Sequence, residues 1–115
     1  MINGIGLDIT DIKKIQRINK EKLVNRILTD NEKILMTGMA EARQIEFLAG
    51  RFAGKEAFSK ALGTGIGKEC SFQDIEILKE STGKPVLYFK GEKVNGFISI
   101  THTKDYAAAQ VILQS

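Results

Sequence analysis

Residues 41–65, EARQIEFLAGRFAGKEAFSKALGTG, decide the fold of this chain. Apolar side chains fall on two sides of the helical wheel that this stretch predicts. One side carries Ile45, Leu48, Ala49, Phe52 and Ala53, and the other carries Phe47, Phe58 and Leu62. A helix over 41–62 that is apolar on both sides is buried between other elements. Gly63 ends it, as glycine commonly does at helix C-termini.

The residues before this helix predict a strand and shorter helices. Positions 2–9 alternate, with isoleucine and leucine on one face and Gly4, Gly6 and Asp8 on the other, as in a β-strand. We expect a helix over 12–18 and a helical stretch over 22–36. Thr29 and Glu32 interrupt the second stretch with the spacing of a capping box.

The residues after the long helix predict strands at 71–79, 86–89, 97–103 and 106–113. The last two form a hairpin around Lys104 and Asp105. We therefore predict an α+β fold, with residues 1–115 as a single domain. In it, the long central helix packs on a mainly antiparallel sheet of about five strands.

Composition bounds the class of protein. Of 115 residues, 43% are hydrophobic and 27% charged, which is ordinary for a globular domain that folds without disulfides or structural metal. The net charge of +3 is compatible with an acidic partner, a phosphate-rich ligand or RNA, and selects none of them. Cys70 is the only cysteine, and no stretch predicts a signal peptide or membrane span, so we expect a cytoplasmic protein.

Asp8 stands near the end of an otherwise apolar strand. Gly4 and Gly6 share its face, and glycine leaves space in which a ligand or another backbone can approach the carboxylate. Asp8 can instead cap the helix that follows, a role equally open to Thr10 and Asp11. The strand pattern alone does not decide between a ligand site and a cap.

Glu56 falls inside the apolar stripe of the long helix. A buried, ionised glutamate must be paired or bound to a metal, because its unpaired burial is costly. Lys60 lies one turn further, so an internal Glu56–Lys60 ion pair is one solution. The other is an oxygen-rich magnesium site formed by Asp8, Glu56, water and phosphate. Lys60 would then stabilise phosphoryl oxygens.

His102 and the glycines after the long helix are further candidates for a functional site. A lone histidine near a strand end is commonly a structural hydrogen-bonding residue, and one His and one Cys are too few for a zinc site. Gly63, Gly65 and Gly67 follow a helix, whereas the glycines of phosphate loops precede one. We expect these glycines to end the helix and turn the chain.

Five stretches occur in the order found in one known family. Residues 4–9, GIGLDI, resemble the opening motif of bacterial holo-acyl-carrier-protein synthases, and residues 51–65 resemble their long central signature. Residues 72–77, 83–85 and 99–103 (FQDIEI, GKP and SITHT) fit in the same order. The resemblance covers almost the whole chain. Gly54 stands where the family commonly has alanine, and Thr101 where many relatives have serine.

The resemblance implies the 4′-phosphopantetheinyl transferase fold and its magnesium-dependent reaction. The substrates would be coenzyme A and apo-acyl carrier protein, and the products the holo-carrier of fatty acid biosynthesis and adenosine 3′,5′-bisphosphate. By resemblance, Asp8 and Glu56 hold Mg²⁺ and act in catalysis with Lys60. Arg51, Lys60, His102 and Thr103 lie in the coenzyme A site. A homotrimer with active sites between subunits is also implied, with no nucleic acid and no membrane as partner.

An acidic carrier protein would meet a basic surface. Lys14 and Arg17 lie about one turn apart on the first predicted helix and can present one face to it. Lys13 is interpreted as part of a solvated surface. Two alternatives remain open from the residues alone: a basic module that binds RNA, and a trimerisation domain without activity.

Overall fold

A computed structural model describes residues 1–115. The elements in chain order are β1 (Ile2–Asp11), α1 (Ile12–Arg17), α2 (Lys20–Ile27), α3 (Asp30–Met36), α4 (Glu41–Leu62), the 3-10 turn η1 (Phe72–Asp74), β2 (Ile75–Lys79), β3 (Pro85–Phe89), β4 (Glu92–Lys93), β5 (Gly96–His102) and β6 (Tyr106–Gln114). The predicted α+β class is confirmed. None of the helices has the length and apolar character needed to cross a membrane.

The strands form two antiparallel sheets, with orders β1-β6-β5 and β2-β3-β4. The prediction of one sheet with about five strands is therefore corrected to two sheets of three. β4 contains only two residues, too few to show the alternating pattern by which a strand is predicted. The strand predicted from residue 71 begins only at Ile75, because Ser71 and Asp74 form a capping box that turns the chain into η1.

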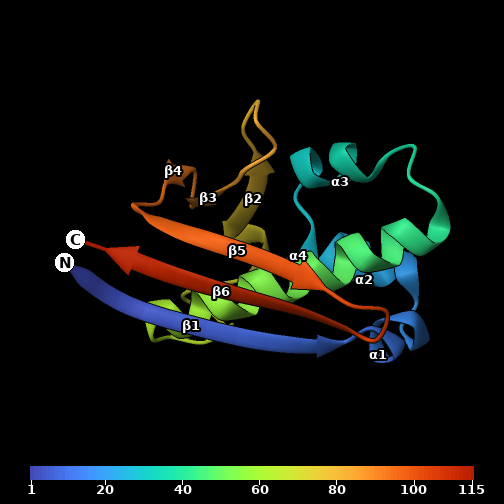
Figure 1. Ribbon diagram of the computed structural model, residues 1–115, viewed down its shortest axis with the longest axis horizontal. Coiled ribbons are helices and arrows are strands. Elements are labelled where there is room, and N and C mark those ends of the chain that lie inside the picture. Colours follow the sequence, from blue (N-terminus) through green and yellow to red (C-terminus); the bar gives the residue numbers. More distant parts are fainter.

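The long helix α4 lies across the inner face of the first sheet (Figure 1). The two glycines of β1 permit this close approach. A Cβ atom would lie 2.1 Å from the Ala61 carbonyl oxygen if added to Gly4, and 1.8 Å from that of Ala57 if added to Gly6. The space predicted beside Asp8 is thus filled by the backbone of α4, and this contact brings Asp8 toward the helix.

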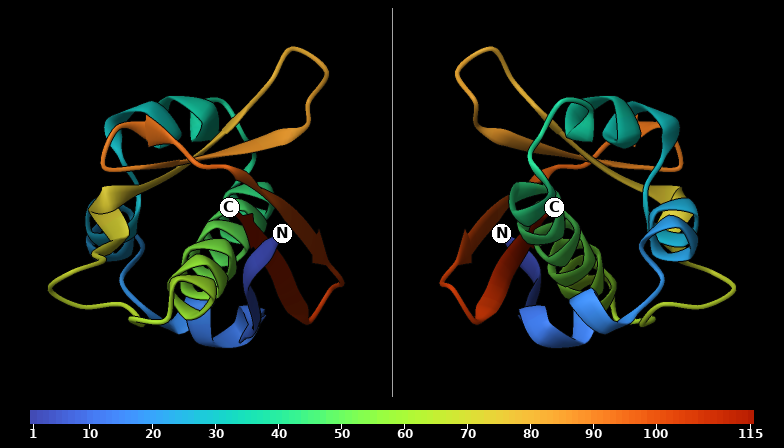
Figure 2. Two further views of the ribbon diagram at one scale, coloured as in Figure 1. Left: turned by 90° about the vertical axis from the view of Figure 1, so that its left-hand side faces the viewer. Right: turned by 90° about the vertical axis from the view of Figure 1, so that its right-hand side faces the viewer.

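The opposite side of α4 is also covered, as its two apolar stripes predict. Figure 2 shows α4 between the first sheet and a layer of α2, α3 and η1. Leu48 packs with Ile27 and Phe72 near the start of the helix, and Phe58 packs with Ile77 near its end. Local hydrogen bonds set the boundaries: Thr29 and Glu32 form the predicted capping box of α3, and Gly63 ends α4 at φ 94°.

The outer face of the first sheet carries no covering element. Ile5, Leu7 and Ile9 of β1 are 59%, 62% and 67% exposed. The register places Phe97 of β5 and Ile112 of β6 in one row with Ile5. A strip of large apolar side chains is therefore open on the face of the sheet opposite α4.

Candidate active site

Asp8 and Lys60 form the first part of the site. The Asp8 Oδ1 atom lies 3.1 Å from Lys60 Nζ, which also donates to the Leu7 carbonyl oxygen, and Asp8 Oδ2 accepts a hydrogen bond from Thr10. Asp11, not Asp8, caps α1. Lys60 therefore pairs with the strand carboxylate, and the alternative of a Glu56–Lys60 ion pair is not formed.

Glu56 faces the same pocket as Asp8 and is partly exposed to it. Its carboxylate accepts no hydrogen bond from the protein, although the residue lies on a helix that is otherwise well buried. Burial raises the pKa of Glu56, and the negative charge of Asp8 raises it further, against the opposing effect of Lys60 and Arg26. Two carboxylates thus share one site, and only Asp8 is paired directly with a cation.

The pocket over this carboxylate pair has a volume of about 340 Å³ and includes Lys14 of α1 and the apolar side chain of Phe52. Lys14, predicted to meet an acidic partner, is therefore beside Asp8 and Glu56. Arg17 lies in the last turn of the same short helix and is exposed. The basic surface of α1 borders the carboxylate site.

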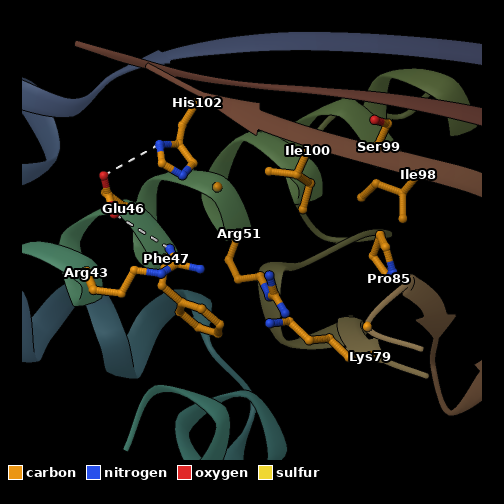
Figure 3. Close-up of a pocket in the computed structure, with 12 residues that line it drawn as sticks. Arg43, Glu46, Phe47, Arg51, Lys79, Pro85, Ile98, Ser99, Ile100 and His102 are labelled. Atoms are coloured by element: carbon orange, nitrogen blue, oxygen red, sulfur yellow. Dashed lines mark ion pairs between the residues drawn. The ribbon is translucent and has the colours of Figure 1, made fainter. Parts of the chain in front are cut away.

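A second pocket, of about 330 Å³, lies on another side of α4 (Figure 3). Its lining includes Arg43, Arg51, Lys79 and His102, with Glu46 as the only acidic residue. Glu46 approaches Arg43 at 3.8 Å and His102 Nδ1 at 3.5 Å. Cations outnumber acids in this pocket, so its charge suits an anionic ligand.

Arg51 is the most unusual group in the second pocket. It is only 6% exposed, its Nε and Nη2 atoms have no hydrogen-bond partner, and its guanidinium lies 4.3 Å from the ring centre of Phe47. Burial lowers the pKa of Arg51 to about 10, opposed by Glu32 and assisted by Arg43. It stays charged at neutral pH. A buried cation with unpartnered N–H groups fits an anion such as phosphate.

Thr103 lies beside this pocket but serves the chain turn. It lines a neighbouring hollow with His102, between α1, α4 and the β5–β6 connection. Its hydroxyl oxygen accepts hydrogen bonds from the backbone N–H groups of Asp105 and Tyr106. The side chain of Thr103 therefore holds the hairpin that carries His102.

The predicted residues are brought together in two groups, not one. Asp8, Glu56 and Lys60 are on one flank of α4, and Arg51 and His102 are on the other. Arg51 and Glu56, five residues apart, point about 140° apart around the helix axis. No pocket includes members of both groups.

Several residues of these pockets were missed at the level of sequence. Arg43 precedes Arg51 by about two helical turns, a spacing that could have suggested a shared flank. Lys79 ends a predicted strand and gave no signal. Lys55 and Glu32 were also missed as a pair: they form a fully buried ion pair with an Nζ–Oε1 distance of 2.6 Å.

Comparison with known proteins gives a consistent result across the chain. The family described as "ACPS: 4'-phosphopantetheinyl transferase superfamily" matches residues 4–111. The holo-[acyl-carrier-protein] synthase of Bacillus subtilis (strain 168) is 53% identical over 117 residues, which cover 99% of this chain and 97% of that protein. That of Geobacillus sp. (strain WCH70) is 47% identical, with 99% and 98% covered.

Solved structures agree with this similarity in three dimensions. A holo-(acyl-carrier-protein) synthase from Bacillus anthracis str. Ames, in complex with CoA (3′,5′-ADP), superposes with a TM-score of 0.89 at 48% identity, covering 100% of this chain and 98% of that chain. The holo-[acyl-carrier-protein] synthase from Neisseria meningitidis gives 0.87 at 34% identity, with 100% of both chains covered.

Proposed function

This chain belongs to the 4′-phosphopantetheinyl transferase superfamily, with the holo-[acyl-carrier-protein] synthases as its relatives, and we propose that it transfers 4′-phosphopantetheine from coenzyme A to a serine of apo-acyl carrier protein. The observation that carries the proposal is one helix with a carboxylate pair on one flank and a buried, unpartnered guanidinium on the other. A module that only binds RNA does not need the carboxylate pair.

Asp8 and Glu56 would hold the magnesium ion. They line one pocket, and the Glu56 carboxylate has no hydrogen-bond donor of its own, a donor set that fits a hard divalent cation. When bound, the ion would neutralise charge on the pyrophosphate of coenzyme A. Lys60, anchored beside Asp8, would stabilise the phosphoryl oxygens as charge builds on them.

Arg51 and His102 would bind coenzyme A, with Arg43 as a third member of the same site. The phosphates of the ligand would supply the negative charge that this pocket lacks, and Arg51 lines the pocket with a guanidinium whose Nε and Nη2 atoms have no hydrogen-bond partner. The solved relative from B. anthracis that is in complex with CoA (3′,5′-ADP) supports a nucleotide in a protein of this fold. Thr103 would contribute by holding the hairpin that carries His102.

The reaction joins the two flanks. The serine oxygen of the carrier forms a bond to the phosphorus that bears pantetheine, and the bond from that phosphorus to the bridging pyrophosphate oxygen breaks. Adenosine 3′,5′-bisphosphate leaves with the electron pair, and the serine proton passes to water or to a carboxylate of the site. Lys14 and Arg17, at the edge of the carboxylate pocket, would orient the acidic carrier for this attack.

A homotrimer would supply both flanks at each active site. Within one chain α4 separates Glu56 from Arg51, and the exposed strip around Leu7 offers a surface for a neighbouring copy. A mixture of the variants Glu56→Gln and Arg51→Gln, each expected to have low activity on its own, tests this. After subunit exchange, about a quarter of the interfaces would combine two intact halves and regain activity. No recovery after demonstrated exchange would mean that each site lies within one chain.

Residues 1–115 would act as one domain, in the cytoplasm and in fatty acid biosynthesis. Cys70 is the only cysteine and is buried, so the chain has no intramolecular disulfide that a reducing compartment could break. The relatives named above are matched over almost their full length.

The test of the function is an intact-mass measurement. Incubation with Mg²⁺, coenzyme A and apo-acyl carrier protein should add one phosphopantetheine to the carrier, and a chelator should prevent it. Glu56→Gln should lower the rate at least 100-fold, whereas Glu41→Gln, at the exposed start of α4, should leave it unchanged. No added mass with the wild-type protein, as a trimerisation domain without activity would give, would refute the proposal.

A further inference from the structure

Glu32 is a fully buried carboxylate at the start of α3, far in sequence from every predicted site residue. Its Oε1 atom accepts hydrogen bonds from the backbone N–H of Thr29 and from Lys55 Nζ, at 2.9 and 2.6 Å. Its Oε2 atom accepts from the backbone N–H of Ile77 at 2.9 Å. The carboxylate is thus fixed from three elements, α3, α4 and β2.

Arg51 is the remaining neighbour of this carboxylate. Its Nε atom lies 3.9 Å from Glu32 Oε2, close enough for strong attraction but too far for a hydrogen bond. Phe47 holds one face of the guanidinium, and the side chain points toward Lys79 in the pocket (Figure 3). Glu32 and Phe47 therefore hold the guanidinium from behind, and neither accepts a hydrogen bond from its Nε or Nη2 atom.

Lys55 determines how much of the Glu32 charge reaches Arg51. The Lys55 ammonium has three N–H groups and uses all of them, on Glu32 Oε1 and on the carbonyl oxygens of Ile27 and Phe72. Glu32 is therefore already paired with one cation before Arg51 is counted. Lys55, Arg51 and Glu32 together keep one excess positive charge. Of the two cations, Arg51 is the one that lines the pocket.

We propose that Glu32 is a positioning residue for coenzyme A binding: it holds the guanidinium of Arg51 in the pocket, while Lys55 prevents it from neutralising Arg51 completely. The inference rests on the proposed placement of coenzyme A against Arg51. It gives the capping box of α3 a second role, because the carboxylate that closes the N-terminus of α3 also sets the geometry of the ligand site.

The experiment is a double-mutant cycle with Glu32→Gln and Arg51→Gln, measuring the Kd of coenzyme A by calorimetry and the KM of both substrates. Glu32→Gln should raise the Kd and KM of coenzyme A about tenfold, within the range of couplings between neighbouring residues. The KM of apo-acyl carrier protein and the kcat per folded protein should stay within twofold. In the Arg51→Gln background, Glu32→Gln should have no further effect.

Glu76→Gln is the matched control. Glu76 accepts a hydrogen bond from the Thr29 hydroxyl in the same network but is not paired with Arg51. A loss of packing would act alike in both variants and reduce the folded fraction without raising the KM of coenzyme A. If Glu32→Gln does not fold, Glu32→Gln combined with Lys55→Met removes both buried charges and should raise the same Kd.

Three results would overturn the inference. An equal effect of Glu32→Gln in the presence and absence of Arg51 would show that the two do not act together. Tighter binding by Glu32→Gln would make Glu32 a competitor of the ligand. If Arg51→Gln itself bound coenzyme A as the wild type does, the placement of the ligand would fail as well, whereas an effect of Arg51→Gln alone would leave that placement intact.

Discussion

Gly6→Ala probes the contact between β1 and α4 on which the carboxylate site depends. A Cβ atom on residue 6 would lie 1.8 Å from the Ala57 carbonyl oxygen and 2.7 Å from the Ala61 nitrogen, against an ordinary contact distance of 3.4 Å or more. Both atoms belong to helical backbone and cannot rotate away. Overpacking costs roughly 1–3 kcal/mol, and the rigid neighbours put this case near 3 kcal/mol. For a chain of this size, the melting temperature should fall by roughly 10–15 °C.

The same substitution should also reduce activity. Relief of the clash requires α4 to move away from β1, and this movement separates Asp8 from Glu56 and Lys60. A misplacement near 1 Å can lower a rate by roughly 100-fold, so kcat should fall even at temperatures where the variant is fully folded. Thermal unfolding by circular dichroism and the rate of carrier modification at 20 °C below the variant's melting temperature measure the two effects separately.

Gly67→Ala is the control for this prediction. Gly67 has no atom within 4 Å of the position of an added Cβ and needs no left-handed backbone conformation, so its variant should match the wild type in melting temperature and rate. Wild-type stability and activity in Gly6→Ala would refute the close approach of strand and helix. The explanation of the glycine pair in β1 would then be wrong.

Three further changes have defined outcomes. The pKa of Glu56 is raised in the folded state, so the unfolded chain loses this proton at lower pH than the folded chain does. Without divalent ions, the free energy of unfolding should therefore fall as the pH rises through and above the ordinary pKa of 4.5. Glu56→Gln should flatten this part of the pH profile when stability is measured by urea unfolding. Lys60→Met should lower kcat by roughly 100-fold with little change in stability, because Lys60 is half exposed; a change confined to melting temperature would contradict its role. Leu7→Asp should reduce the proposed homotrimer to smaller species in analytical ultracentrifugation, whereas Ile34→Asp, similarly exposed on α3, should not.

The parts of the fold that sequence predicted well are those set by local interactions. The two apolar stripes of residues 41–62 predicted α4 with its observed ends, since the helical period repeats over 22 residues and Gly63 supplies the left-handed cap. The Thr29–Glu32 capping box could also be predicted, because its hydrogen bonds join residues only three positions apart. The division of the strands into two sheets was not, because strand order is decided by contacts between distant segments.

The candidate site divides in the same way. Spacing within a helix suggested a Glu56–Lys60 pair. Lys60 instead pairs with Asp8, a residue 52 positions away that β1 brings next to α4. Glu32 and Lys55 are separated by 23 residues, so nothing in the local pattern marked them as partners. The pairs that define electrostatics here are long-range, and only the ordered motifs of a family could point to some of them.

The arrangement around α4 suggests why one helix carries so much of the family signature. Within residues 51–60, Arg51 faces one pocket and Lys55 contacts the buried carboxylate of Glu32. Glu56 faces the other pocket, and Lys60 pairs with Asp8 at its edge. A rigid helix fixes the relative positions of these groups more tightly than loops would. A shift of α4 would therefore disturb the Arg51 pocket, the buried ion pair and the carboxylate pair together. The glycines of β1 and Glu32 on α3 both contact α4 directly and so help to fix its position.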